Sequence, residues 1–240
     1  MSETSKTAVI GLGSMGYGIA ISALRGGHAT YGFDVNADQA ARFRSEGGLD
    51  GQLEEIAPTL DVVLTVVLNA EQTEAVLFGP DGVVPHLADG AVVIACATVP
   101  PAFAKDMAVR CAAHSVHYLD APISGGSVKA AEGKLSIMAS GSPEAFSAAR
   151  PVLDCISETV FELGDAAGAG SAMKAVNQLL AGVHIATMAE ALTFGMTQGV
   201  APEKFLDVIS KCAGTSWMLE NRAPHIVDGD YTPHSSVNIW

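Results

Sequence analysis

The chain has 240 residues, 49% of them hydrophobic, and a formal net charge of −13 at pH 7. This length suits one large domain or two smaller ones, each able to bury a hydrophobic core. The negative charge argues against nucleic acids and anionic membrane surfaces as partners. The four cysteines lack a paired spacing, and no histidine spacing is typical of a metal site, so we expect free thiols and no metal.

Two features at the level of whole segments predict a soluble, cytoplasmic protein. The N-terminus leads directly into an apolar strand candidate, which predicts that the chain has no signal peptide. The longest strongly apolar run, Val62–Leu68, is too short to cross a bilayer.

Short apolar runs alternate with helix-compatible segments over residues 1–164. The strand candidates are Thr7–Ile10, Thr30–Phe33, Val62–Val67, Val92–Ala95, His117–Leu119, Leu135–Ala139 and Thr159–Leu163. Nearly continuous Val, Ile and Leu in the early runs is typical of parallel strands that are buried on both faces. The alternation of strands and helices predicts an α/β domain with a doubly wound sheet.

A glycine-rich turn follows the first strand candidate and leads into a helix candidate, Tyr17–Arg25. The turn reads Gly11-Leu12-Gly13-Ser14-Met15-Gly16. Gly11 permits a tight turn, Gly13 lets backbone N–H groups approach a pyrophosphate, and Gly16 lets helix and strand pack closely. The pattern predicts a Rossmann-type dinucleotide site, with the phosphates at a helix N-terminus. A plain glycine loop is the alternative.

Asp34 ends the second strand candidate, 18 residues after Gly16. A carboxylate at this place accepts hydrogen bonds from the adenosine ribose of the dinucleotide. The same negative charge would repel a 2′-phosphate group. Asp34 therefore predicts NAD rather than NADP as the cofactor.

Residues 165–240 have a different character. The proline-free segment Ser171–Val200 is rich in Ala, Leu and Met, which predicts one long helix. Two shorter helices are predicted over Glu203–Cys212 and Trp217–His225. The apolar stretch Val237–Trp240 carries no stop signal. We therefore expect an all-helical second domain that is truncated at its C-terminus.

A second glycine motif follows the fifth strand candidate and reads Asp120-Ala121-Pro122-Ile123-Ser124-Gly125-Gly126. Ser124 offers a hydroxyl group, and Gly125 and Gly126 offer backbone N–H groups that are free of bulky side chains. Successive N–H groups of this kind form a concave nest that binds anions. The motif is a candidate carboxylate site, with a plain glycine turn as the alternative.

Lys174 lies near the start of the predicted long helix, with Asn177 and Gln178 three and four residues further on the same face. A lysine there opposes the helix dipole, so another reason for its presence is needed. In an apolar cleft its pKa would fall, making it a general base for an alcohol or a general acid for a carbonyl. Asn177 or Gln178 could orient Lys174 or bind substrate. A solvated surface lysine is the alternative.

Together these motifs resemble those of the β-hydroxyacid dehydrogenase family, which includes 3-hydroxyisobutyrate dehydrogenases and tartronate semialdehyde reductases. The family motifs GxGxMG, DxPVSGG and GxGxxxKxxNN are similar here to Gly11–Gly16, Asp120–Gly126 and Gly168–Gln178. The resemblance implies that Lys174 is catalytic and that Ser124–Gly126 binds the substrate carboxylate. It also implies a homodimer or homotetramer.

Some family positions differ in this chain. Gln178 replaces the second asparagine of the lysine motif, Leu68-Asn69 stands where Leu-Pro is usual, and Ala97-Thr98 stands where Ser-Thr is usual. The resemblance implies further cofactor contacts at Leu68, Asn69 and Thr98. Family members carry one more lysine beyond the position of Trp240, in a segment that helps cover the cofactor.

Four segments resemble the L-threonate dehydrogenase branch of the family in particular: Ser127–Ala131, Asn177–His184, Ser216–Arg222 and Asp228–His234. This resemblance implies NAD-dependent oxidation of the C2 hydroxyl of L-threonate or a similar four-carbon sugar acid, with Lys129 as an extra positive contact. The alternatives are 3-hydroxyisobutyrate oxidation, tartronate semialdehyde reduction, and a non-catalytic dinucleotide-binding protein.

Overall fold

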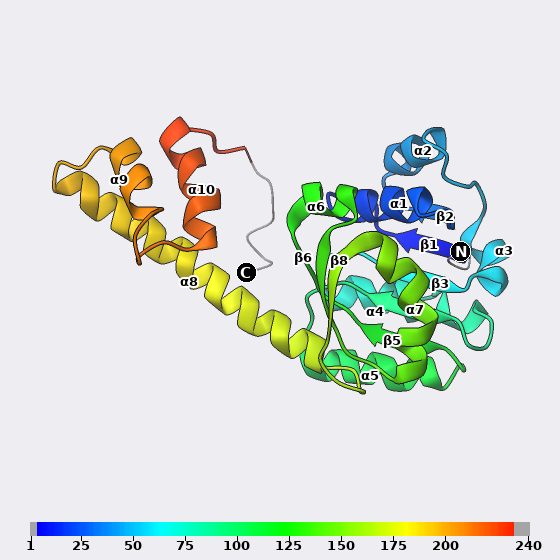
Figure 1. Cartoon of the computed structure of the whole chain (residues 1–240). Helices are drawn as coiled ribbons and strands as arrows, with labels where there is room; N and C mark the ends of the chain where they lie inside the picture. Colours follow the sequence, from blue (N-terminus) through cyan, green and yellow to red (C-terminus); the bar gives the residue numbers. More distant parts are fainter. Residues whose placement is uncertain (1–3, 233–240) are drawn as a thin grey trace. The chain divides into compact units, whose positions relative to one another are not determined.

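The computed structural model describes residues 4–232, which divide into two compact units between Lys174 and Ala175. The first is an α/β unit and the second is helical (Figure 1). The division falls inside a single long helix, so the predicted domain boundary at residue 164 stays a prediction. The apolar segment Val237–Trp240, on which the expected truncation rests, lies outside the described residues.

All seven predicted strands are present, and strands and helices alternate up to residue 162 except where the unpredicted strand β6 directly follows β5. The strands are β1 (Lys6–Ile10), β2 (Ala29–Phe33), β3 (Val62–Thr65), β4 (Val92–Ala95), β5 (His117–Asp120), β6 (Ile123–Ser124), β7 (Leu135–Ala139) and β8 (Ser157–Glu162). The helices of the first unit are α1 (Gly16–Arg25), α2 (Ala37–Ser45), α3 (Leu53–Ile56), α4 (Ala70–Phe78), α5 (Pro101–Ala112), α6 (Gly126–Glu132) and α7 (Pro143–Ile156).

The main sheet has five parallel strands in the order β2-β1-β3-β4-β5. Successive side chains alternate between its two faces, and both faces are buried. Val9 and Leu64 pack under α1 and α7, whereas Val63 and Val93 pack under α4 and α5. This confirms the predicted doubly wound α/β arrangement, because the continuous Val and Ile runs supply apolar side chains to both faces.

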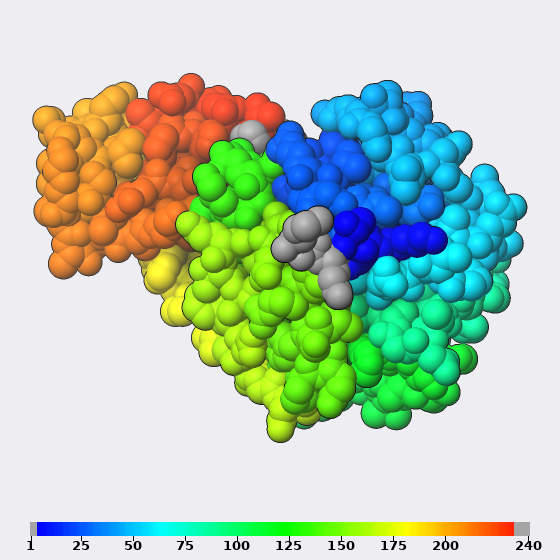
Figure 2. All heavy atoms as spheres, turned by 45° about the vertical axis from the view of Figure 1, so that its right-hand side comes forward, coloured from blue at the N-terminus to red at the C-terminus, as the bar shows by residue number. Residues whose placement is uncertain are grey.

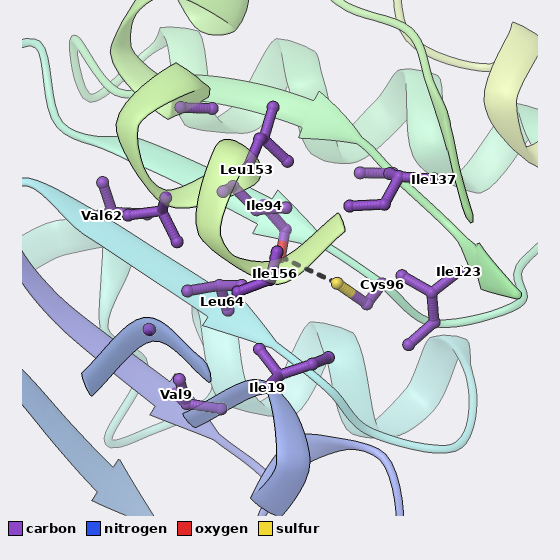
Figure 3. Close-up of a cluster of buried hydrophobic side chains, with 14 of the residues drawn as sticks. Val9, Ile19, Val62, Leu64, Ile94, Cys96, Ile123, Ile137, Leu153 and Ile156 are labelled. Atoms are coloured by element: carbon purple, nitrogen blue, oxygen red, sulfur yellow. Dashed lines mark hydrogen bonds between the residues drawn. The ribbon is translucent and has the colours of Figure 1, made fainter. Parts of the chain in front are cut away.

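Figure 3 shows the core on the face covered by α1 and α7. Ile19 from α1 and Leu153 and Ile156 from α7 point toward strand residues such as Leu64 and Ile94. Each such side chain contributes about 1.5–3 kcal/mol when it is fully buried. This packing holds the carboxyl ends of the strands, where the glycine turn and the motif after β5 begin.

The last two strand candidates correspond to β7 and β8 and do not extend the main sheet. They form a second sheet with the short strand β6, in the order β6-β7-β8. β6 runs antiparallel to β7, and β7 runs parallel to β8. The chain leaves β5 and pairs at once with β7: Asp120 and Ser140 exchange two backbone hydrogen bonds of 3.0 and 2.8 Å. Apolar periodicity predicts that a segment is a strand, but not which strand lies beside it.

The second unit contains most of α8 (Ala169–Thr197), together with α9 (Pro202–Ile209) and α10 (Trp217–Asp228). Its small core contains Met188, Leu192, Phe205, Leu219 and Ala223. The three helices confirm the predicted helical second part.

The 29-residue α8 is, by length and composition alone, the one described helix that could cross a membrane. The expectation from Val62–Leu68 overlooked it, because Lys174 and scattered polar residues interrupt its apolar run. A single such helix is weak evidence for a membrane span.

Candidate active site

The glycine-rich turn lies between β1 and α1, as predicted. Gly11 has φ +99°, and a side chain there would collide with the carbonyl oxygen of Val66. A side chain at Gly16 would collide with the carbonyl oxygen of Gly11. At Gly13, by contrast, a Cβ atom would meet no atom within 4 Å. The first and third glycines are therefore required by packing, and the second leaves open space.

The open space at Gly13 fits a dinucleotide pyrophosphate. Gly13 and Ser14 are exposed immediately before α1, and Met15 is its N-cap residue, without a side-chain cap. The first turn of α1 carries no acidic residue. An anion can therefore approach the N–H groups and the positive end of the helix dipole without competition from a carboxylate of that turn.

Asp34 lies directly after β2 and beside the glycine turn. Its Oδ2 accepts the N–H of Leu12 at 2.6 Å, and its Oδ1 accepts the N–H of Asn36 at 2.8 Å. The side chain of Leu12 is buried in the core, so only its backbone is available to contact groups at the turn. The structure thus brings the predicted ribose-binding carboxylate to the turn that is predicted to bind the phosphates.

The other predicted cofactor residues follow neighbouring strands of the same sheet. Leu68 is exposed after β3, and Asn69 is the N-cap of α4, where its Oδ1 accepts the N–H of Gln72 at 2.9 Å. Thr98 is half-buried after β4. All three lie beyond the carboxyl ends of parallel strands, as the glycine turn does, where open α/β sheets bind ligands. Their contacts with a dinucleotide stay predictions.

The predicted carboxylate nest lies between β6 and α6. Gly125 and Gly126 have φ +137° and +77°, which favour glycine; Gly125 is the N-cap of α6 and Gly126 is its first residue. Ser124, at the end of β6, is half-buried. The turn therefore has the left-handed backbone expected of an anion-binding nest, and carboxylate binding there stays a prediction.

The helix that follows the nest is packed tightly against α1, and Figures 1 and 2 show α6 in green beside α1 in blue. A side chain at Gly18 would lie 2.6 Å from the backbone nitrogen of Ala131. The hydroxyl of Ser22 donates to the Ala130 carbonyl at 2.8 Å, and Arg25 donates to the Ala131 carbonyl at 3.0 Å. The helices that follow the glycine turn and the nest are thus in direct contact.

Lys129 lies on the exposed side of α6. Its aliphatic stem passes over Gly125, and its Nζ lies 3.6 Å from Glu158 Oε2 on β8. This ion pair directs the ammonium group toward β8. A contact between Lys129 and substrate stays a prediction.

Lys174 is not a solvated surface lysine. Only 8% of it is exposed, and its Nζ donates a hydrogen bond of 2.9 Å to the carbonyl oxygen of Ile123. Burial lowers the pKa of Lys174 from 10.5 to about 8. Since Ile123 directly precedes Ser124, the amine is held one residue from the candidate carboxylate nest.

The first turn of α8 lies directly before Lys174, and its packing explains the spacing of Gly168 and Gly170. Gly168 has φ +111°, and a side chain at Gly170 would collide with the Met138 carbonyl and lie 2.7 Å from the Asp120 carbonyl. The helix start is therefore pressed against the ends of β5 and β7. A larger residue at either glycine would shift the turn that carries Lys174.

Asn177 and Gln178 follow on α8, beyond the division between the units. The Nδ2 of Asn177 donates to the Oε1 of Gln178 at 3.1 Å, so the two amides contact each other. Their predicted roles toward Lys174 or substrate stay predictions.

Three groups at this site are not among the predicted site residues: the Ile123 carbonyl, the Asp120 carboxylate and the Ser140 hydroxyl. Asp120 and Ser140 contact the start of α8, which lies 30 to 51 residues away in the chain. The only signal that could have indicated Asp120 is its place at the head of the substrate motif.

Over residues 4–232, no group of three or more His, Cys, Asp or Glu side chains could hold a metal ion. Burial raises the pKa of both Cys96 and Cys111 to about 12, which leaves these thiols protonated and unreactive. Lys174 is the described side chain best suited to proton transfer beside the nest.

Two family models match consecutive parts of the chain. Residues 6–164 match the NAD binding domain of 6-phosphogluconate dehydrogenase, and residues 168–240 match the model described as NAD-binding of NADP-dependent 3-hydroxyisobutyrate dehydrogenase. The chain is 50% identical over 233 residues to an L-threonate dehydrogenase of Cupriavidus necator, a match that covers 97% of this chain and 78% of the relative. An L-threonate dehydrogenase of Escherichia coli is 44% identical, with the same coverage.

A solved structure described as 3-hydroxyisobutyrate dehydrogenase from Salmonella typhimurium has a similar fold. Its TM-score is 0.91 and its sequence identity 43%, and the match covers 98% of this chain and 82% of that chain. The fold of both units is therefore similar to the fold of that structure.

Proposed function

Since the chain belongs to the β-hydroxyacid dehydrogenase family of NAD-dependent oxidoreductases, we propose that it oxidises the C2 hydroxyl of L-threonate or a similar four-carbon sugar acid. The observation that carries this proposal is the buried Lys174 amine, hydrogen-bonded to the residue before the Ser124–Gly126 nest. The identity of 44–50% to relatives named L-threonate dehydrogenases supports the substrate.

The residues of the first unit suggest how the reaction proceeds. The hydroxyl of Ser124 and the N–H groups of Gly125 and Gly126 bind the substrate carboxylate, which places the neighbouring C2 hydroxyl toward Lys174. The neutral amine of Lys174 takes the hydroxyl proton. When bound, the nicotinamide ring supplies the hydride acceptor.

The pKa of Lys174 sets the expected pH dependence. Oxidation needs the neutral amine, so its rate should rise as the pH increases through about 8. Reduction needs the ammonium form, so the reverse rate should fall over the same interval. A protein that only bound a dinucleotide would gain nothing from a buried lysine with a lowered pKa.

We propose NAD rather than NADP as the cofactor, because the negative charge of Asp34, beside the glycine turn, would repel a 2′-phosphate group. The Asp34 carboxylate also accepts hydrogen bonds from two backbone N–H groups, which hold the side chain at the turn. Asp34→Ala should weaken NAD binding and reduce the discrimination against NADP. An unchanged preference, measured as the ratio of kcat/KM for the two cofactors, would show that Asp34 does not select the cofactor.

A second candidate substrate is 3-hydroxyisobutyrate, because the Salmonella relative bears that name. The two candidates differ in geometry: the reacting carbon of a 3-hydroxy acid lies one atom further from the carboxylate. With the carboxylate held at Ser124–Gly126, only one of these positions places the hydroxyl group at Lys174.

The test is NADH formation from a panel of L-threonate, L-erythronate, D-glycerate, 3-hydroxyisobutyrate and tartronate, with NAD and NADP supplied in turn. Turnover of four-carbon 2-hydroxy acids supports the proposal. Turnover of 3-hydroxyisobutyrate alone would replace it with the second candidate. No turnover, together with measurable NAD binding in a fluorescence titration, would contradict both.

We further propose a cytoplasmic homodimer or homotetramer. In the second unit, α8 exposes the apolar side chains of Val176, Leu179, Leu180 and Val183, each 49–67% accessible. A second copy of the chain would cover such a surface, since contiguous apolar patches of this kind are typical of interfaces. Light scattering during size-exclusion chromatography checks the mass; a monomer at micromolar concentration would contradict this proposal.

A further inference from the structure

The N-terminus of α8 is closed by a carboxylate from a distant strand. The Oδ2 of Asp120 accepts the N–H groups of Gly168 and Ser171, both at 2.9 Å. Its Oδ1 accepts the hydroxyl of Ser171 at 2.6 Å. Asp120 is 1% exposed and comes from the end of β5, so the helix start is bound to the main sheet.

Ser140 completes this network from the end of β7. Its hydroxyl donates to Asp120 Oδ2 at 3.3 Å and accepts the N–H of Gly170 at 2.9 Å. The backbones of Asp120 and Ser140 are also paired with each other. Three N–H groups at the start of α8 are therefore satisfied by side chains that β5 and β7 hold in place.

We propose that Asp120 is a positioning residue for Lys174: with Ser140 and Ser171, it fixes the first turn of α8 so that the Lys174 amine stays at the Ile123 carbonyl. Ser171 lies three residues before Lys174, which places the two side chains on the same face of the helix. Both are buried on that face. This inference rests on the proposed role of Lys174 as the proton acceptor.

The strength of this contact follows from its chemistry. Hydrogen bonds to an ionised carboxylate are stronger than neutral ones, and a negative charge at a helix N-terminus is favourable to the dipole. A buried network with every member satisfied is rigid, and leaving one donor unpaired is costly. Small displacements of a reacting group reduce the rate strongly, so a rigid start of α8 should favour a high turnover rate.

Asp120 acts on Lys174 through position rather than through its charge. The pKa of Lys174 is lowered by burial, with no charged neighbour contributing to the shift. Besides Asp120, Lys105 of α5 also packs on the helix start, with its stem against Gly168. If the first turn loosens, Lys174 should gain water and its pKa should return toward 10.5.

The experiment compares Asp120→Asn and Ser171→Ala with Ser142→Ala in the whole chain. Ser142 caps α7, its hydroxyl accepting the N–H of Ala145 at 3.2 Å, so its removal is a matched loss of a helix cap away from Lys174. Trace acetylation with acetic anhydride at increasing pH, read by mass spectrometry of the Lys174 peptide, measures the titration of this lysine without requiring turnover. Circular dichroism and NAD binding confirm folding.

We expect Asp120→Asn to raise the midpoint of Lys174 acetylation by about one pH unit or more. It should also lower kcat for NADH formation about 10- to 100-fold, with the KM for NAD unchanged. Ser171→Ala should shift both in the same direction by less. Ser142→Ala should move neither. The alkaline shift matters because a purely structural loss would lower the active fraction without moving a titration midpoint.

An unmoved acetylation midpoint in Asp120→Asn would overturn the inference, as would an equal shift in Ser142→Ala. If Asp120→Asn does not fold, Ser171→Ala carries the same test, because it removes one hydroxyl and leaves the carboxylate. Lys174→Ala separates this inference from the proposed function. If that variant kept full turnover, Lys174 would not be the base, whereas the midpoint shift would still report on its position.

Discussion

Two helix starts in the α/β unit contain a glycine pair with the same spacing, but the two N-termini are used in opposite ways. Before α1, the pair Gly11 and Gly13 leaves the helix start open, with Gly13 facing free space. At α8, Gly168 directly precedes the helix and Gly170 is its second residue, and the Asp120 carboxylate closes the helix start. The same motif thus prepares one site for an external anion and fills the other with the protein's own.

This contrast shows that a glycine-rich helix start is not by itself a ligand site. At α1 the missing side chain leaves room for a ligand, and no acidic residue lies in the first turn. At α8 the missing side chain leaves room for the backbone of β5 and β7. The first arrangement favours binding of a phosphate, and the second favours rigidity next to the Lys174 amine.

The largest effect is expected at the closed helix start, from Lys174→Ala. Loss of the proton acceptor should lower turnover about 10³-fold, or about 4 kcal/mol in activation free energy, with NAD affinity nearly unchanged. Lys204→Ala, an exposed lysine of α9 paired with Asp207, is the matched control. If Lys174→Ala lost NAD binding together with turnover, the start of α8 would not act independently of the start of α1.

Gly170→Ala tests whether the second glycine before Lys174 is required for packing. The new methyl group would collide with the Met138 carbonyl, so we expect a loss of about 3 kcal/mol in the free energy of unfolding. Gly182→Ala, on the same helix, meets no atom within 4 Å and should be neutral or slightly stabilising. Urea denaturation measures both, and equal stabilities would refute the close approach.

Gly13→Val tests the open helix start. The valine side chain would enter free space, so stability should be retained while NAD binding weakens by about 2 kcal/mol, or roughly 30-fold. Gly13→Ala should give a smaller loss. A fluorescence titration with NADH measures both affinities. A variant that binds NADH as tightly as the parent would show that the pyrophosphate lies elsewhere.

The smallest effect is a gain in stability from Lys174→Met. Folding lowers the pKa of Lys174 from 10.5 to about 8, so the buried ammonium destabilises the folded state below pH 8. The penalty fades as the pH rises from 8 to 10.5, where the unfolded chain also loses the proton. At pH 7 the methionine variant should be about 1–2 kcal/mol more stable, after allowance for the lost Ile123 hydrogen bond. A gain that does not shrink at pH 10 would contradict this cause.

The sequence predicts the main sheet well because two features of the sequence identify its strands. Val62–Thr65 and Val92–Ala95 are continuous apolar runs, which only a strand buried on both faces requires, and helices separate them. Neither feature identifies β6, which has two residues and is defined by its pairing with β7. Pairing between segments is a tertiary property, so periodicity along the chain does not contain it.

The candidate site divides in the same way. The three glycines of the turn, Asp34 and Lys174 are recognisable because each occupies a fixed place relative to a strand end or helix start. The contact of Lys174 with the Ile123 carbonyl spans 51 residues and involves a backbone atom, which every residue type possesses. The sequence therefore predicts Lys174 as a site residue. Its lowered pKa and its hydrogen bond to Ile123 can be seen only in the folded structure.

The contact between α1 and α6 at Gly18 has a consequence for the timing of binding. Because the Ala130–Ala131 backbone lies against this glycine, the glycine turn and the nest are attached to neighbouring helices that cannot separate without opening their shared contact. A dinucleotide that ordered the start of α1 would therefore remove motion from α6 as well. The carboxylate of a later ligand would then meet a nest that had already lost part of its conformational entropy. Ordered addition, with the dinucleotide first, is the binding order expected from this close approach at Gly18.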